Sequence, residues 1–90
     1  MPGRSSYSIE FTPAAQRALL AFGMPVRRRL ASKIDGLAEN PRPPGVKALV
    51  GELKGLYRLR VGDYRVLYQV KDKALVVLVV GLGNRREAYR

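Results

Sequence analysis

Three arginines lie close together in one short stretch of the sequence, at Arg58, Arg60 and Arg65. They flank Gly62 and Asp63, and the residues on both sides alternate between apolar and polar types, which predicts two antiparallel strands joined by a two-residue turn. That turn would place Arg60 directly opposite Arg65, with Arg58 on the same face of the sheet. Opposed like charges are unfavourable by about 0.2–1 kcal/mol, so we expect this face to bind an anion.

The preferred anion of such a face is a phosphate, because the planar arginine fork binds phosphate in a bidentate manner and stays charged. Further cations and an aromatic ring are expected to join it from the segments before and after the predicted strands. Phosphate-binding cations beside a stacking ring are what single-stranded RNA recognition uses. We therefore predict a concave basic site with Arg58, Arg60, Arg65, Arg85 and Tyr89 at its centre and with Lys47, Lys54 and Arg86 as further substrate-binding residues.

A structural interpretation of the same charges is a solvated outer face, which we favour for the helical run Arg27–Arg29. It suits the strand arginines less well, because an arginine facing an arginine has no structural purpose, although Glu52 or Asp63 could neutralise one of them. Tyr89 could cover a sheet edge instead of stacking on a base. On facing alone, three other tyrosines are expected in the core, at Tyr57, Tyr64 and Tyr68.

The composition supports a polyanionic partner and removes several classes of chemistry. Seventeen Lys and Arg against seven Asp and Glu give a net charge of +10, which favours a nucleic acid or an acidic protein. The chain has no cysteine and no histidine, which excludes disulfides, thiol nucleophiles, Ser-His-Asp chemistry and histidine-ligated metals. The acidic residues show no metal-ligand spacing, so neither a metal nor a cofactor is expected.

Ninety residues predict one domain, spanning 1–90. The longest apolar run, Ala74–Leu82, is too short to cross a bilayer, and the first residues contain no apolar signal segment. We therefore expect a cytoplasmic protein without a membrane partner.

The element order predicts an α+β fold. A strand is expected over Tyr7–Phe11, then a helix that is opened by Thr12 and Pro13 and ended by Gly23. Pro25 begins a second helix, and a short joint between the two predicts an αα-hairpin on a sheet. The apolar stripe of the second helix consists of Val26, Leu30, Ile34 and Leu37.

A three-stranded antiparallel meander is predicted after the break at Asn40–Gly45. The segment Val46–Lys54 could be a loop or a short strand. Two-residue joints, at 62–63 and at 72–73, separate the meander strands, and Gly62 suits a type II′ turn. The last strand is apolar on both faces, so it is expected to be central or covered twice. The three strands are Leu56–Val61, Tyr64–Lys71 and Ala74–Leu82.

This arrangement resembles the RelE toxins of the RelE/ParE superfamily over essentially the whole chain. The most specific stretch is Leu56–Val70, followed by the closing segment GNRREAY. The resemblance implies an endoribonuclease that enters the decoding site of a translating ribosome and cuts mRNA, by attack of a ribose 2′-hydroxyl on the adjacent phosphate. It also implies a cognate antitoxin that wraps the toxin and blocks the basic site.

The resemblance gives each central residue a counterpart in the family. It matches Arg65 to the family's phosphate-binding arginine. Our hypothesis is that Arg65 and Arg85 hold the scissile phosphate, that Arg58 and Arg60 stabilise developing charge, and that Tyr89 stacks on a base. The best-known RelE toxins carry lysines where this chain has Arg58 and Arg60, and an arginine cannot act as a base. The proton acceptor could then be Lys54, a tyrosine or a ribosomal group, or the site could work mainly by electrostatics.

Two other functions are compatible with the sequence. ParE-type toxins share the fold and bind DNA gyrase, but they generally lack the full basic set of Arg58, Arg60, Arg65 and Arg85. The third possibility is a non-catalytic RNA-binding module. Arrest of protein synthesis, DNA damage or neither effect on expression would distinguish the three.

Overall fold

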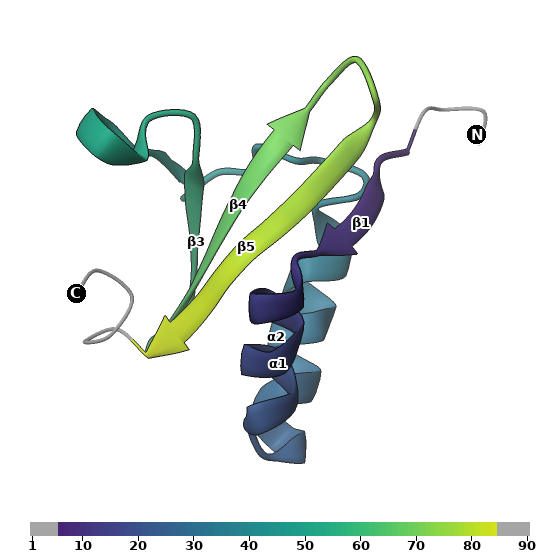
Figure 1. Cartoon of the computed structure of the whole chain (residues 1–90). Coiled ribbons are helices and arrows are strands. Elements are labelled where there is room, and N and C mark those ends of the chain that lie inside the picture. The colour runs from purple at the N-terminus through teal and green to yellow at the C-terminus, as the bar shows by residue number, and fades with distance from the viewer. Residues whose placement is uncertain (1–5, 85–90) are drawn as a thin grey trace.

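In a computed structural model, which describes residues 6–84, two helices cover one face of a five-stranded sheet (Figure 1). The strands lie in the order β1-β5-β4-β3-β2, with β1 parallel to β5 and every other neighbouring pair antiparallel. The predicted α+β fold is confirmed, and β5 is central as expected. The elements are β1 Ser8–Phe11, α1 Pro13–Ala21, α2 Met24–Gly36, β2 Lys47–Ala48, the 3-10 helix η1 Gly51–Leu53, β3 Tyr57–Val61, β4 Tyr64–Lys71 and β5 Val76–Asn84.

The helices begin where the sequence predicts. The Thr12 side chain accepts a hydrogen bond from the Ala15 backbone N–H at 3.1 Å, and proline follows at the first helical position. Arg27 is not simply solvated, because its guanidinium donates to the carbonyl oxygens of Leu20 and Phe22 at the end of α1. Arg27 thereby satisfies carbonyls that the helix end leaves without a partner. No helix within residues 6–84 has the length and apolar character to cross a membrane.

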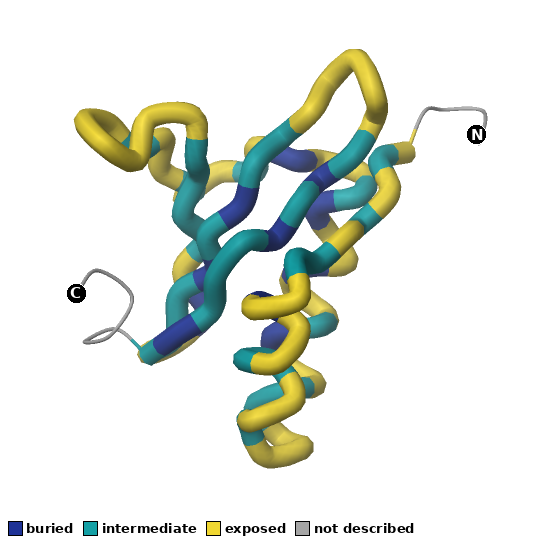
Figure 2. The backbone as a smooth tube through the Cα atoms, viewed as in Figure 1, coloured by how far each residue is buried: buried dark blue, intermediate teal, exposed yellow. Residues whose placement is uncertain are grey.

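The core lies between the helices and the inner face of the sheet, with α1 against β5 and α2 against β3. Figure 2 shows this as buried backbone in the middle of β4 and β5 and on the inner side of α2. The predicted stripe of α2 is confirmed, with Val26 packed against the core. The fully buried large side chains are Leu30, Ile34, Leu37, Val66, Tyr68, Val77 and Val79.

The first hairpin has the predicted register, with Arg60 opposite Arg65 and Val61 opposite Tyr64. Gly62 has a φ of +61° and Asp63 a negative φ, which agrees with a type II′ turn. A side chain at Gly62 would be strained in this conformation, so the glycine is required by the turn.

The second hairpin differs from its prediction. Its loop contains the four residues 72–75, not the two at 72–73, so β5 begins at Val76 and extends to Asn84. The loop closes through Leu75, whose φ of +57° is in the left-handed region. A bulky apolar residue seldom adopts that conformation, so the alternation of residue types gave no sign of the longer loop. The first meander strand likewise begins one residue later, at Tyr57.

A β-bulge interrupts the pairing of β4 with β5. Leu67 pairs with Gly81 and Tyr68 with Val79, so Val80 is the extra residue on β5. Before the bulge, Val77 and Val79 point toward the helices; after it, Leu82 does, opposite the buried Val66. The bulge thus reverses the facing of β5 and places Gly81 on the outer face.

Tyr68 connects this sheet to the break after α2. Its ring is fully buried, and its hydroxyl donates a 2.7 Å hydrogen bond to the carbonyl oxygen of Pro41. Burial is the main reason that the pKa of Tyr68 rises to about 12. The hydroxyl therefore stays protonated and holds the loop against the sheet over the whole physiological pH range.

We expect Tyr68→Phe to lower the free energy of unfolding by about 1–3 kcal/mol, because it leaves the buried Pro41 carbonyl without a donor. The measurement is equilibrium unfolding in urea. Tyr64→Phe is the matched control, since among residues 6–84 the Tyr64 hydroxyl forms no hydrogen bond and its ring packs on Phe22. Equal losses from the two variants would contradict the role given to the Tyr68 hydroxyl.

Candidate functional site

The outer face of the sheet brings four cations together in two neighbouring rows. The register pairs Lys47 with Arg58 in one row and Arg60 with Arg65 in the next. Directly opposed residues have Cβ atoms about 4.5–5.5 Å apart, so each row sets two positive charges side by side. We call the surface formed by Lys47, Arg58, Arg60 and Arg65 the arginine face.

Glycines continue both rows on the neighbouring strand. Arg58 pairs with Leu67 on β4, and Leu67 pairs in turn with Gly81 on β5. In the next row, Arg65 pairs with Gly83. The two glycines reach this face because of the bulge at Val80. Gly81 is half-buried and Gly83 is buried, and neither adds a side chain to the outer face.

The arginines differ in how firmly they are held. Arg58 and Arg65 are half-buried and their Nε atoms are buried, whereas Arg60 is exposed. A guanidinium whose stem is already packed loses less freedom on binding an anion. Arg60 stands at an open edge, because within the described residues no strand pairs with β3 beyond Arg58 on that side.

Neither acidic neighbour neutralises the arginine face. In the described part of the chain, Glu52 and Asp63 form no ion pair with any of its residues. The register nevertheless brings like charges side by side in both rows. A phosphate placed between them would relieve their repulsion and accept charge-assisted hydrogen bonds.

The other residues predicted for the site do not lie on the arginine face of the described structure. Lys54 is exposed at the end of η1 and is not part of either row. The three strand tyrosines belong to the inner face as predicted: Tyr57 stacks on Tyr68 with ring centroids 5.6 Å apart, and Tyr64 meets Phe22 edge-on. Arg85, Arg86 and Tyr89 lie outside the described residues.

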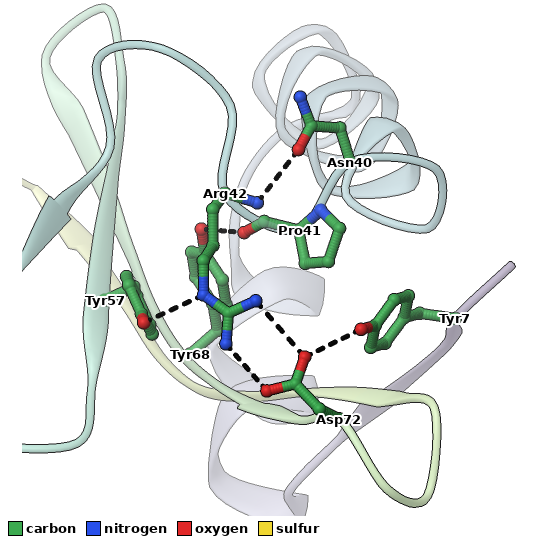
Figure 3. A network of polar contacts seen from close by, with 7 residues as sticks. All are labelled: Tyr7, Asn40, Pro41, Arg42, Tyr57, Tyr68 and Asp72. Atoms are coloured by element: carbon green, nitrogen blue, oxygen red, sulfur yellow. Dashed lines mark hydrogen bonds and ion pairs between the residues drawn. The ribbon is translucent and has the colours of Figure 1, made fainter.

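A second polar cluster, which the sequence did not predict, lies at the opposite end of β4 (Figure 3). Arg42 forms an ion pair with Asp72 at 2.8 Å and donates to the Tyr57 hydroxyl, and the Tyr7 hydroxyl donates to Asp72 at 2.7 Å. These residues are 15 to 65 positions apart in the chain, and no local spacing could have indicated them. The cluster fastens the N-terminal strand, the proline-rich break and the second hairpin together.

Hydrogen bonds within this cluster shift the pKa values of Asp72 and Tyr7. The Arg42 guanidinium, helped by the Tyr7 hydroxyl, lowers the pKa of Asp72, and Asp72 in turn raises the pKa of Tyr7. The Arg42–Asp72 pair is about half exposed, so its energetic contribution is that of a surface pair.

Known proteins that are similar to this chain are toxins of toxin–antitoxin systems. The profile of the family described as "ParE toxin of type II toxin-antitoxin system, parDE" matches residues 9–89. The mRNA interferase toxin RelE of Escherichia coli (strain K12) is 31% identical over 88 residues, which cover 92% of this chain and 87% of that protein.

Solved structures show the same relationship. A chain of the toxin–antitoxin complex RelBE2 from Mycobacterium tuberculosis superposes with a TM-score of 0.83 at 27% identity, over 93% of this chain and 97% of that one. The archaeal RelE–RelB complex from Pyrococcus horikoshii OT3 gives a TM-score of 0.78 at 32% identity, over 92% and 99% of the two chains.

We expect Asp72→Asn to make the protein less stable at neutral pH but not in acid. Because the folded-state pKa of Asp72 is lowered, its carboxylate contributes stability above the unfolded value of about 3.9, and that contribution is lost as the pH falls through the folded pKa. Urea unfolding between pH 7 and pH 3 should therefore show the difference from wild type closing below about pH 4. A difference that stays constant with pH would contradict this. The control is Asp63→Asn, which removes an exposed carboxylate that forms no ion pair within residues 6–84.

Proposed function

The chain belongs to the RelE/ParE superfamily of type II toxin–antitoxin toxins, in its RelE-like branch, and we propose that it cleaves mRNA in the decoding site of the translating ribosome. The observation that carries the proposal is the arginine face, where Lys47 lies opposite Arg58 and Arg60 opposite Arg65, beside side-chain-free positions on β5. Such a surface suits a phosphodiester, whose transition state gains negative charge on its oxygens.

In the proposed reaction, the ribose 2′-oxygen bonds to the adjacent phosphorus while the bond from phosphorus to the 5′-oxygen of the next nucleotide breaks. The 2′-hydroxyl proton leaves to an acceptor, and the 5′-oxygen takes up a proton, leaving a cyclic phosphate and a free 5′-hydroxyl. Arg65, together with Arg85, holds the scissile phosphate. Arg58 and Arg60 stabilise the charge that develops on it, and Tyr89 stacks on a base.

The described residues narrow the choice of proton acceptor. Tyr57, Tyr64 and Tyr68 are on the helix side of the sheet, which argues against an acceptor among them. Lys47 is on the arginine face opposite Arg58, so its amine joins that of Lys54 as a candidate within the chain. A group of the ribosome is the other candidate, and it would make cleavage depend on the ribosome.

Gyrase inhibition is the second candidate, because the matching family profile carries the ParE name. The curated relatives at 30% identity or more carry RelE-type names instead, and the arginine face has no role in the gyrase interpretation. Purified protein that inhibits DNA supercoiling and leaves ribosome-bound mRNA intact would favour gyrase.

The partner proposed from the solved relatives is an antitoxin. The structures of the relatives include complexes with RelB antitoxins, and we propose that a cognate antitoxin binds this chain and covers the arginine face. An acidic antitoxin segment would complement the positive charge that Lys47, Arg58, Arg60 and Arg65 gather on this face.

We expect Arg65→Gln to reduce mRNA cleavage on programmed ribosomes by about 100- to 1,000-fold, the usual effect of removing one group that stabilises transition-state charge. Lys71→Gln is the matched control, because Lys71 is on the same strand and the same face but about 20 Å away. The exposed Arg60→Gln variant provides a second test with little risk to folding, and cleavage should be mapped with and without ribosomes. Wild-type cleavage by both arginine variants would contradict the proposal.

We expect antitoxin binding to weaken as salt is raised, because charge pairs at a partly exposed interface are screened. Titration calorimetry of the toxin with its antitoxin at about 0.05 and 0.5 M salt measures the change in dissociation constant. The Arg60→Gln variant should show a smaller change between the two salt concentrations than wild type. An affinity that is the same at both salt concentrations would indicate an apolar cover instead of an acidic segment.

A further inference from the structure

Two adjoining hollows lie between α2 and the open edge of β3. They have volumes of about 460 and 450 Å³ and share Ser32, Lys33 and Arg60 in their walls. The first also includes Arg28, Arg29 and Gly62, and the second continues to the proline-rich loop at 43–45. Because the hollows share walls, they form one trough, which we call the α2 groove.

The α2 groove is strongly cationic. Arg28, Arg29 and Lys33 of α2 line it with Arg60 of β3, and none of its lining residues is acidic. Within residues 6–84, none of these four side chains takes part in an ion pair or a hydrogen bond. The run Arg27–Arg29 was expected to be only a solvated helix face; Arg28 and Arg29 are exposed, but they also form the wall of a groove.

The turn of the first hairpin lies close to one of these arginines. A Cβ atom built on Gly62 would lie 2.8 Å from Nη2 of Arg29, so the guanidinium occupies the space that a side chain at this position would need. The glycine required by the turn therefore also lets Arg29 approach the end of β3. The groove and the arginine face are thus joined through the same turn.

We propose that the α2 groove binds the phosphodiester backbone of the RNA strand whose scissile phosphate lies on the arginine face, a few nucleotides along from the cut. Arg60 belongs to both surfaces, so one positive path leads from the face around the open edge of β3 to α2. A row of cations without carboxylates suits phosphates that recur along a strand, and it binds them regardless of the base. This inference rests on the proposed RNA cleavage and extends it to a second part of the substrate.

The test compares two variants with equal loss of charge. The groove variant combines Arg28→Gln, Arg29→Gln and Lys33→Gln; the control combines Arg17→Gln, Lys71→Gln and Lys73→Gln, which are exposed and outside the groove. The probes are fluorescent RNAs of about three and about twelve nucleotides, methylated at every 2′-oxygen to prevent cleavage, and dissociation constants are measured from 50 to 200 mM salt.

Wild type and control should bind the long RNA more tightly than the short one, and the groove variant should lose that preference. Removing three phosphate contacts reduces the salt slope by about two, so the advantage of wild type over the groove variant should shrink about sixteenfold across this salt range. A variant with Arg28→Lys and Arg29→Lys, and with Lys33 unchanged, keeps all three positive charges. It should therefore keep most of the preference for the long RNA.

The remaining outcomes overturn the inference in distinct ways. A length preference that persists in the groove variant, or is absent from wild type, removes the groove from RNA binding. If the groove variant loses affinity for programmed ribosomes regardless of mRNA length, the groove contacts ribosomal RNA instead of the substrate strand. If it loses affinity for the antitoxin alone, the groove is a protein-binding site. Failure of wild type to cleave mRNA on ribosomes would refute the proposed function separately, since the binding assay does not use cleavage.

Discussion

The register of the β3–β4 hairpin is the constraint on which the described site depends. The turn at Gly62 and Asp63 sets it, and a slip of one residue would turn Arg58 and Arg60 into the core and bring Leu59 to the surface. The positive φ of Gly62 makes the tight turn possible, and its missing side chain leaves room for Arg29. One glycine therefore permits the turn that sets Arg60 opposite Arg65 and leaves the space that the Arg29 guanidinium occupies.

The helix-facing side of the sheet forms the hydrophobic core, and the outer side carries the candidate site. All the fully buried large side chains lie on the helix side, where burial of apolar area stabilises the fold. The outer face can then tolerate opposed cations, whose mutual repulsion is small beside that burial. The bulge at Val80 completes this division, because it keeps Leu82 in the core while bringing Gly81 to the outer surface. The cluster around Asp72 fastens the far end of the sheet without contributing to the charged site.

The parts of the fold that local rules govern could be predicted from the sequence. The first hairpin is one, because strict alternation and the turn type leave a single register for Arg60 and Arg65. The facing of β5 could not be predicted, since a strand that is apolar on both sides gives no sign of where an extra residue such as Val80 sits. The left-handed Leu75 and the contacts of Arg42 with Asp72 depend on tertiary packing, which no local pattern encodes. Arg85, Arg86 and Tyr89 lie outside the described residues, so their place in the site stays a prediction.

The central position of β5 has a consequence for the timing of toxicity during synthesis. This strand is made after every other described element, yet it lies between β1 and β4, and its pairing of Val76 with Ser8 joins distant parts of the chain. Non-local pairings of this kind form slowly and cooperatively. A nascent chain can form its helices and the first hairpin, but it lacks the floor of the site until β5 has emerged and inserted. Until β5 has inserted between β1 and β4, a partner protein can therefore meet the chain with its site unassembled.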